Sequence, residues 1–303
     1  MLVSVCLCTY KRDTLDKTLS SVINQELPDE CQLEVVVVDN DENESGRAIC
    51  EHHASTQSDV QIRYFVNSER NLAAVRNSTL EYAKGDYLVF IDDDEWADSS
   101  WISALYSSLQ EFGADAVFGP VNVRYPENSP HWIVDGDMFG KDKHRTGKAL
   151  TKGATSNAIL KAHWVKEKKF RFDPEFGKSG GEDTDFFHRI YKDGAHLVFD
   201  NRAIVSETVE PHRLSIDYLK KQNIRIGQTH WNYLWSKQKG LSFVKTGLFV
   251  TFQVIAASIL TVVTLPFGKS RYAKWYLLLI RNIEKLKMAV VGNSKRVELY
   301  GNH

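Results

Sequence analysis

The chain has 303 residues, of which 43% are hydrophobic and 25% are charged, with a formal net charge of −1. This composition excludes a wholly disordered chain, and the length suits one large α/β domain with an appendage or two small domains. The near-neutral charge gives no reason to expect nucleic acid as a partner.

The first half of the chain alternates short apolar runs with helical stretches. Alternation of this kind indicates a mostly parallel sheet, whose ligands bind at the carboxyl ends of the strands. No G-x-G-x-x-G follows the first strand, which disfavours a dinucleotide-binding Rossmann domain. The first residues also lack a basic leader before a long apolar core, so we expect no secretory signal peptide. Strands are predicted at 2–9, 33–38, 59–65 and 87–91, and helices at 16–25 and 71–83.

The middle of the chain is less regular, and it contains a long polar stretch at 125–153. We expect strands at 116–123 and 196–198 and a helix at 186–191, and the segment 154–160 is apolar.

After about residue 215 the chain changes character. Residues 246–265 carry no formal charge, and this stretch is long enough to span a bilayer. Residues 271–291 have the pattern of an amphipathic, basic helix. From Lys269 onward there are eight Lys or Arg and two Glu, which suits an anionic membrane surface. We expect a tail at the cytoplasmic face of a membrane, held peripherally, by a re-entrant hairpin or by a single span. The alternative is a soluble helical cap.

Three consecutive carboxylates, Asp92, Asp93 and Asp94, follow the predicted buried strand at 87–91. Neighbouring carboxylates repel one another, and a divalent cation is an economical compensator. On a strand, Asp92 and Asp94 would point the same way, which fits a site for Mn²⁺ or Mg²⁺ completed by phosphate oxygens. The alternative is a solvated acidic loop or a helix cap.

A second acidic cluster contains Glu182 and Asp183, and two glycines precede it that let backbone approach a ligand closely. Transfer of a group to a hydroxyl needs a base, which a carboxylate facing the acceptor can provide. The alternative role for Asp183 is the N-cap of a helix that begins near Asp185.

A third charged element is Arg76, on the predicted helix that leads toward the acidic strand. Its guanidinium is a candidate clamp for a diphosphate, and the alternative is an ordinary surface arginine.

Together these segments resemble family 2 glycosyltransferases. The resemblance covers about residues 1–230. Each matching block alone is weak evidence for the family, but five blocks in the family's order are specific evidence for it. Among family members, the bacterial exopolysaccharide glucosyltransferases of the succinoglycan type are the most similar in character. The matching blocks are 3–12, 36–40, 71–77, 85–94 and 181–186.

The resemblance implies a GT-A fold, an α/β fold with a mostly parallel central sheet flanked by helices, and here a C-terminal helical membrane-associating extension. It places a catalytic domain at 1–215, with a nucleotide-sugar-binding half at 1–112 and an acceptor-binding half at 113–215. Residues 216–303 would form the helical tail.

The resemblance also implies roles for individual residues. Asp183 would be the catalytic base, and Glu182 would position the acceptor. Asp94 would bind the metal directly, with Asp92 and His212 as further candidate ligands; a lone His is more often structural. The nucleotide-sugar would be bound by Thr9, Tyr10, Arg12, Asp39, Asn71, Arg76, Asp92 and Asp93, with Asp39 accepting from a uracil ring.

One departure from the family bears on processivity. Polymer-forming members carry Q-x-x-R-W, whereas this chain has Gln222 and Arg225 followed by Ile226. We therefore expect one sugar to be added per encounter.

The predicted function is inverting, metal-dependent transfer of a sugar from a nucleotide-sugar, expected to be a UDP-sugar, to a saccharide or lipid-linked saccharide in surface polysaccharide synthesis. Two alternatives stay open. A nucleotidyl or phosphoryl transferase is disfavoured by the absence of G-x-x-x-x-G-K-[ST]. A non-catalytic membrane adaptor with the same fold is disfavoured by the presence of both acidic clusters.

Overall fold

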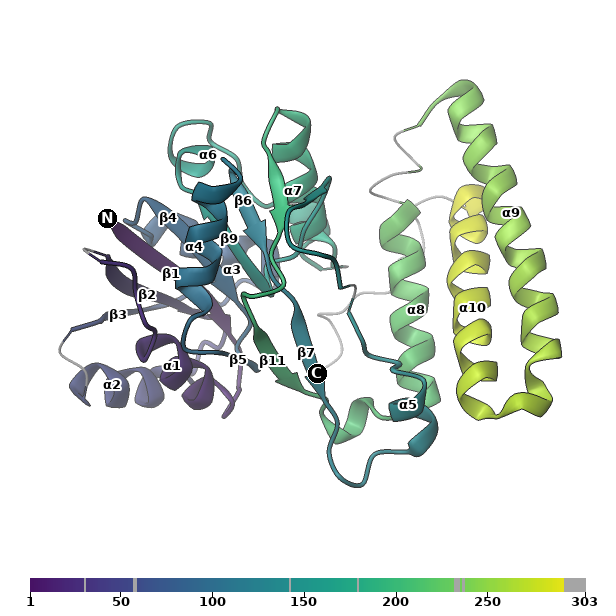
Figure 1. Cartoon of the computed structure of the whole chain (residues 1–303), viewed down its shortest axis with the longest axis horizontal. Coiled ribbons are helices and arrows are strands. Elements are labelled where there is room, and N and C mark those ends of the chain that lie inside the picture. Colours follow the sequence, from purple (N-terminus) through teal and green to yellow (C-terminus); the bar gives the residue numbers. More distant parts are fainter. Residues whose placement is uncertain are drawn as a thin grey trace. The chain divides into compact units, whose positions relative to one another are not determined.

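The computed structural model describes residues 1–29, 31–56, 59–141, 143–178, 180–231, 235 and 238–291. The chain divides into two compact units, whose elements are labelled in Figure 1. Unit 1 comprises Met1–Val123, Lys141–Lys178 and Glu182–Thr208, and unit 2 comprises Arg124–Gly140, Ser179–Gly181 and Val209–His303.

The main sheet of unit 1 has, among the described residues, eight strands in the order β3-β2-β1-β4-β9-β6-β10-β8. β1 pairs in parallel with β2 and β4, and β2 pairs in parallel with β3. β9 runs antiparallel to both β4 and β6, β10 is parallel to β6, and β8 is antiparallel to β10. The carboxyl ends of the parallel strands and the amino end of β9 therefore share one edge. The strands are β1 (Leu2–Thr9), β2 (Gln32–Asp39), β3 (Gln61–Val66), β4 (Tyr87–Ile91), β6 (Ala116–Phe118), β8 (Lys148–Leu150), β9 (Asn157–Lys161) and β10 (Leu197–Phe199).

A second sheet joins β5 (Glu95–Ala97), β11 (Val205–Thr208) and β7 (Val121–Arg124). The prediction of one strand over 116–123 is therefore wrong, because β6 ends at Phe118 and β7 begins at Val121 in the other sheet. Gly119 and Pro120 cause the break. A side chain at Gly119 would collide with Asn157 and the Ala203 carbonyl, and Pro120 has no N–H for a strand ladder.

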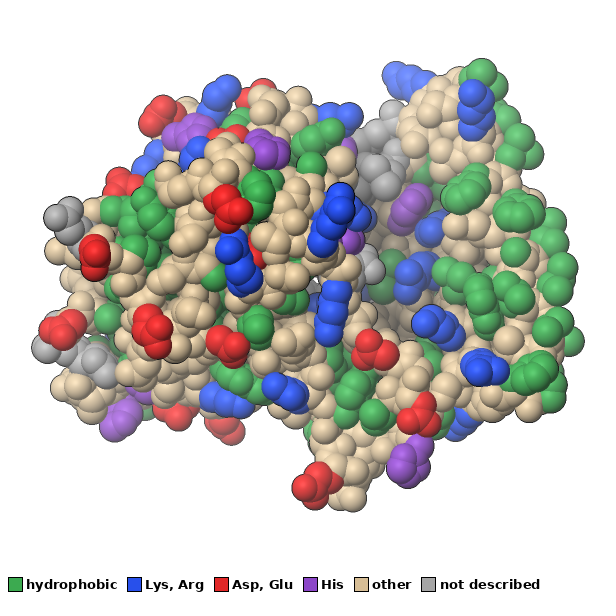
Figure 2. All heavy atoms as spheres, viewed as in Figure 1, with side chains coloured by type: hydrophobic (Ala, Val, Ile, Leu, Met, Phe, Trp, Pro, Cys, Tyr) green, Lys and Arg blue, Asp and Glu red, His purple; other side chains and the backbone are tan. Residues whose placement is uncertain are grey.

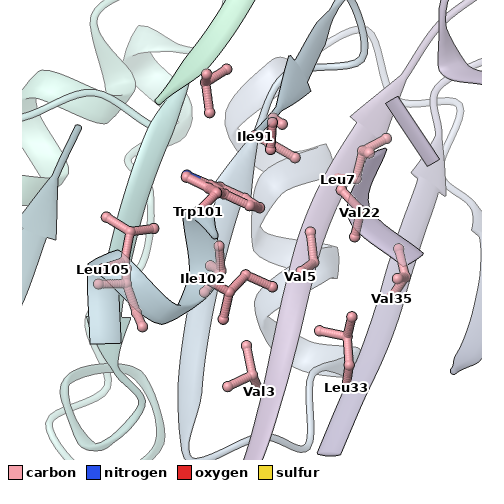
Figure 3. Packing of buried hydrophobic residues seen from close by; sticks show 14 of the residues in the cluster. Val3, Val5, Leu7, Val22, Leu33, Val35, Ile91, Trp101, Ile102 and Leu105 are labelled. Atoms are coloured by element: carbon pink, nitrogen blue, oxygen red, sulfur yellow. The ribbon is translucent and has the colours of Figure 1, made fainter. Parts of the chain in front are cut away.

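Side chains of the central strands alternate between two hydrophobic clusters, one on each face of the main sheet. Val3, Val5 and Leu7 pack with helices α1 (Leu15–Ile23) and α4 (Trp101–Glu111), as Figure 3 shows. The opposite face carries Cys6, Leu88 and Phe90. This face packs against α3 (Leu72–Tyr82), α6 (His163–Lys166) and α7 (Glu182–Lys192). Coverage on both faces explains why these strands are continuous apolar runs. The remaining helices of unit 1 are α2 (Arg47–Thr56) and the short η1 (Pro174–Phe176).

Unit 2 is helical. α9 (Gly240–Val263) and α10 (Lys269–Val291) pack against each other, and the chain reverses between them at Gly268, whose φ is +98°. α8 (Ile216–His230) packs on α10, where Gln228 Nε2 donates to Glu284 Oε1 at 2.9 Å. The unit also contains α5 (His131–Asp135), η2 (Pro211–Arg213) and η4 (Leu265–Phe267). The stretch predicted at 125–153 to be polar thus contains α5 and β8.

α9 is, among the described helices, the one that is long and apolar enough to cross a membrane. It begins at Gly240, earlier than the uncharged stretch predicted from the sequence. Only 17% of its most apolar window is buried, so most of its large side chains face outward. Figure 2 shows these apolar side chains gathered over α9. The most exposed are Leu241, Leu248, Phe249, Phe252 and Val262.

Candidate active site

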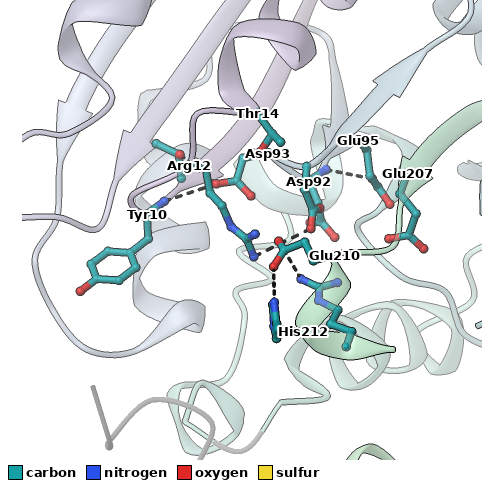
Figure 4. Close-up of polar contacts among 12 residues, drawn as sticks. Tyr10, Arg12, Thr14, Asp92, Asp93, Glu95, Glu207, Glu210 and His212 are labelled. Carbon is teal, nitrogen blue, oxygen red and sulfur yellow. Dashed lines mark hydrogen bonds and ion pairs between the residues drawn. The ribbon is translucent and has the colours of Figure 1, made fainter. Parts of the chain in front are cut away.

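The loop that follows β1 meets the acidic turn that follows β4. The Asp93 carboxylate accepts hydrogen bonds from Thr9 Oγ1 at 2.8 Å and from the Tyr10 amide at 3.3 Å. Arg12 Nη2 lies 3.9 Å from Asp94 Oδ2. In Figure 4 the Arg12 side chain reaches toward the acidic turn and the Tyr10 backbone lies beside Asp93, while the Tyr10 ring points away. Five residues predicted to bind the donor or the metal are therefore neighbours in the structure.

The acidic turn is not an extension of β4. The strand ends at Ile91, so alternation of side chains along a strand does not apply to Asp92 and Asp94. Instead, the Asp92 amide donates to Glu95 Oε2 at 3.0 Å, which closes the turn. The turn directs Asp92 toward Arg76 and Asp93 toward the β1 loop.

The turn carries more negative charge than its surroundings neutralise. Burial, assisted by the charge of Asp94, raises the pKa of Asp93 to about 7, and the hydrogen bond from Thr9 only partly opposes this. Burial also raises the pKa of Asp92, against the lowering effect of Arg76. The pKa of Glu95 lies well above its usual range, again chiefly because of burial. These carboxyls are thus poised to gain a positive partner.

Sequence reasoning missed Lys141, a cation that reaches this turn from the segment before β8. Lys141 Nζ lies 3.3 Å from Glu95 Oε1 and 3.0 Å from Glu207 Oε1. Both carboxylates hold the pKa of Lys141 above its usual value, against the lowering effect of burial. Glu95 extends the acidic run in the sequence, but nothing near Lys141 or Glu207 marks them as its partners.

The residues of the turn fit a divalent cation that a ligand helps to bind. Among the described residues, no group of three or more His, Cys, Asp or Glu is arranged to hold a metal ion. Asp92 and Asp94 supply carboxylate oxygens, which Mg²⁺ and Mn²⁺ prefer, and the local charge favours a cation. A diphosphate and water would complete the coordination. His212 lies on η2 of unit 2, where its Nδ1 is 2.9 Å from Glu210 Oε2, and its role toward a metal stays a prediction.

Arg76 joins α3, the end of β4 and the start of α7. Its side chain is only 11% exposed, so the surface-arginine alternative is wrong. The guanidinium donates to Glu182 Oε1 and lies 3.4 Å from Asp92 Oδ1. We call these three residues the Arg76 cluster. Because both carboxylates already occupy Arg76, its role as a diphosphate clamp stays a prediction.

α7 presents the second acidic cluster at its first turn. The helix begins at Glu182, so the prediction of a start near Asp185 with Asp183 as N-cap is wrong. Asp183 Oδ1 accepts from the Thr184 amide at 2.6 Å. Gly180 and Gly181 precede the helix at φ of +81° and +94°, a conformation that glycine adopts without strain.

Glu182 has one carboxylate oxygen that the described chain leaves unused. The residue is 3% exposed, and its Oε2 is buried with no hydrogen-bond partner among the described residues. Burial raises the pKa of Glu182, against the lowering effect of Arg76. Such an orphan acceptor could receive a hydroxyl hydrogen bond from a bound ligand.

Two further predicted residues are engaged within the protein. Asp39 is fully buried, and its oxygens accept from the amides of Asp41 and Gly46 and from the Tyr64 hydroxyl. Asn71 caps α3, because its side chain accepts from the Ala74 amide at 3.2 Å. In the structure both side chains order segments beside the site, and their contact with a donor stays a prediction.

Comparison with known proteins identifies the architecture. The family model described as Glycosyl transferase family 2 matches residues 4–171, more than half of the chain. The chain is a family 2 glycosyltransferase. The prediction of the family is thereby confirmed.

Two relatives of this glycosyltransferase come from different organisms. It is 35% identical to the succinoglycan biosynthesis protein ExoM of Rhizobium meliloti, over 79% of this chain and 77% of that protein. It is 29% identical to the GalNAc(5)-diNAcBac-PP-undecaprenol beta-1,3-glucosyltransferase of Campylobacter jejuni, over 65% of this chain and 62% of that protein.

Solved structures share the fold of the glycosyltransferase. S. aureus TarS 1–349 in complex with UDP-GlcNAc aligns with a TM-score of 0.57 at 14% identity, covering 100% of both chains. GalNAc-T7 with UDP, GalNAc and Mn²⁺ aligns with a TM-score of 0.57 at 17% identity, covering 96% of this chain and 56% of that one. At such identities these matches establish the GT-A fold alone, which confirms the predicted fold class.

Proposed function

We propose that this glycosyltransferase transfers one sugar, with inversion and a divalent metal, from a UDP-sugar to a hydroxyl of a saccharide or lipid-linked saccharide. The observation that carries the proposal is the position of the acidic turn. It contacts the β1 loop through Asp93 and the Arg76 cluster through Asp92. The residues suited to binding a donor therefore lie around the acidic turn, and the Arg76 cluster links this turn to Glu182, the neighbour of the candidate base Asp183. The names of the two relatives support polysaccharide or lipid-linked acceptors, and the TarS complex supports a UDP-sugar.

The proposed reaction is a single displacement at the anomeric carbon. The bond from that carbon to the diphosphate oxygen breaks, and its electron pair leaves with the nucleoside diphosphate. The acceptor oxygen forms the new bond from the opposite face, which inverts the configuration. Asp183 takes the proton of the acceptor hydroxyl as the sugar passes through an oxocarbenium-like state. Glu182 Oε2, the orphan acceptor, would orient a neighbouring hydroxyl.

Asp94 and Asp92 would hold the metal in this proposal. When bound there, a divalent cation supplies positive charge against the diphosphate of the leaving group. Thr9 and the Tyr10 amide fix Asp93, and Arg12 approaches Asp94, so these groups keep the turn in one conformation while the donor binds. The Mn²⁺ in the GalNAc-T7 structure supports the choice of metal, and Mg²⁺ shares the same oxygen preference.

The same proposal assigns tasks to the two parts of the chain. Residues 1–215 would carry out the transfer, with 1–112 binding the nucleotide-sugar and 113–215 the acceptor, in a surface polysaccharide pathway. Residues 216–303 would hold the enzyme at the cytoplasmic face of a membrane. The exposed apolar side chains of α9 and the basic residues of α10 support this assignment, since apolar surface and cationic side chains together favour an anionic lipid surface.

The deciding experiment measures nucleoside diphosphate released from UDP-, GDP- and dTDP-sugars, with Mn²⁺, Mg²⁺ or a chelator. We expect UDP from one UDP-sugar, more of it when membrane lipid extract supplies an acceptor, and none with chelator or with Asp94→Ala. Asp29→Ala is the matched control, because this exposed carboxylate precedes β2 at the opposite edge of the sheet. The product linkage, read by NMR, should have the anomeric configuration opposite to the donor's.

Each alternative has its own outcome in this assay. Transfer that persists in chelator would refute the metal. A phosphorylated acceptor would indicate the nucleotidyl or phosphoryl transferase instead. No turnover of any donor with lipid extract present would favour the non-catalytic adaptor.

A further inference from the structure

A cavity of about 490 Å³ lies in unit 1 beside the first turn of α7. Its volume is within the range of small-molecule sites in proteins. Phe118 and Phe199, the last residues of β6 and β10, provide an apolar lining together with Leu150 of β8, which pairs with Leu197 at the start of β10. Lys148 and Lys152 lie at its exposed rim. Gly153 also belongs to the lining, and any side chain there would overlap the Phe118 ring, so a bare backbone is needed at this point.

The cavity occupies the half of the sheet edge that the donor residues leave free. Thr9, Asp39 and Asp92 follow β1, β2 and β4, whereas the cavity is formed at β9, β6, β10 and β8, which are next in the strand order. Thr184 lines it and directly follows Asp183 in the chain. Lys141, whose ammonium contacts Glu95, lines it as well. A ligand in the cavity would therefore lie next to the proposed base and on the side away from the nucleotide.

The charge of the cavity is opposite to that of the acidic turn. Among the described residues, its lining contains four basic residues, Lys141, His144, Lys148 and Lys152, and neither Asp nor Glu. Lys141 is neutralised by Glu95 and Glu207. Within the described chain, the one hydrogen-bond contact of Lys148 Nζ is His144 Nδ1 at 3.3 Å, and Lys152 makes no hydrogen bond or ion pair. Two ammonium groups of the lining thus lack an anionic partner among the described residues, which favours a ligand that brings one.

We propose that this cavity binds a phosphate or diphosphate group of the acceptor, with Lys148 and Lys152 as its ligands. The sugar joined to that group would lie along Phe118 and Phe199, and its hydroxyl would reach Asp183 at the Thr184 end. This inference rests on the proposed function and names its acceptor class, a glycosyl phosphate or diphosphate. It adds binding residues to the acceptor half, where sequence reasoning assigned only Glu182 and Asp183 to the acceptor.

The test compares acceptor and donor kinetics in the full chain. Lys148→Ala/Lys152→Ala should raise KM for the lipid-extract acceptor by about 10- to 100-fold, since charge-assisted hydrogen bonds to phosphate are lost. The donor KM and the acceptor-free release of UDP should be unchanged. Lys148→Arg/Lys152→Arg should restore most of the affinity. Lys192→Ala, at the far end of α7, is the control and should have no effect.

Inorganic pyrophosphate, at fixed free metal and with UDP saturating, is the binding probe. It should bind the wild type and the Arg variant, and it should bind the double Ala variant at least about tenfold more weakly. An unchanged acceptor KM, or unchanged pyrophosphate binding, overturns the inference while UDP release keeps the proposed function intact. Absence of UDP release from the wild type overturns the proposed function itself.

A separate arm distinguishes the bound phosphate from a general attraction to lipid. Phosphatidylcholine vesicles with and without phosphatidylglycerol should bind the wild type and the double Ala variant equally. If the variant instead loses binding to the anionic vesicles in proportion to its loss of acceptor affinity, Lys148 and Lys152 contact headgroups and the cavity assignment is wrong.

Discussion

Replacing Arg76 by Met tests whether the Arg76 cluster is a structural centre or a free diphosphate clamp. The Arg76 side chain is 11% exposed and that of Glu182 is 4% exposed, so this pair lies in a poorly solvated environment. Asp92 is 41% exposed, and water screens most of its interaction with Arg76. Loss of one partner from a buried ion pair costs about 3–5 kcal/mol, and we expect the lower end, about 3 kcal/mol, with nearly all of it arising at Glu182.

A second substitution separates the charge from the packing. Arg76→Met/Glu182→Leu removes both charges and leaves no buried ion without a partner. We expect it to recover at least about 2 kcal/mol of the loss, because apolar replacements of a buried pair are often neutral. Lys168→Met is the control, since Lys168 and its partner Asp193 are 52% and 45% exposed, and it should cost less than about 1 kcal/mol.

Urea denaturation followed by circular dichroism measures these free energies of unfolding. The donor KM is measured in parallel from UDP release. If Arg76→Met lowers the free energy by less than about 1 kcal/mol while the donor KM rises, Arg76 is a clamp and the reasoning from burial fails. The reasoning from burial also fails if the double variant is no more stable than Arg76→Met.

The remaining predictions concern the base, a buried carboxylate and the tail. Asp183→Asn should lower the rate of transfer by about 100- to 10,000-fold with the donor KM unchanged, and a raised donor KM would instead move Asp183 to the metal. Burial raises the pKa of Glu34, but three hydrogen bonds, one of them from Arg63, outweigh it and lower that pKa. Glu34→Gln should therefore cost about 2–4 kcal/mol at pH 7. The difference from wild type should begin to shrink as the pH falls below 4.5, the ordinary pKa of Glu, and should disappear only below the lowered pKa of the folded state, where Glu34 becomes protonated; a difference that does not shrink with falling pH would contradict this sign. Phe249→Asp/Phe252→Asp, at side chains 61% and 66% exposed, should reduce binding to anionic vesicles about tenfold or more and leave the free energy of unfolding within about 0.5 kcal/mol; equal vesicle binding would show that α9 does not contact lipid.

The donor half could be predicted from the sequence because its elements are locally distinct. Strands such as Leu33–Val38 are buried on both faces and so appear as unbroken apolar runs. The acidic run comes directly after one of them, which places it at the sheet edge. Short strands could not be predicted from such apolar runs. β8 (Lys148–Leu150) is exposed and begins with Lys, and its pairing with β10 depends on residues about fifty positions later.

The partners of charged side chains were the least predictable part of the site. Arg76 has the same local sequence whether it is a surface residue or a buried one, and its partner Glu182 is 106 residues away. Lys141 gives no signal at all, because its two carboxylates come from β5 and β11, and the sequence indicates neither strand. Periodicity predicts which face a residue occupies, but it does not predict the residue from another element that meets it.

The reversed direction of β9 has a consequence for how this enzyme can diverge. Because β9 enters the sheet at the edge where its neighbours end, the loop before it, and not one after it, forms the cavity wall. That segment, residues 143–156, includes β8 and is separate in the chain from both the acidic turn and the β1 loop. Insertions or charge changes in it leave the register of β1, β2 and β4 untouched. The residues that bind the donor and those that bind the acceptor therefore lie on separate segments of the chain. A lineage could change its acceptor by mutating residues 143–156 while it retains its donor and its chemistry.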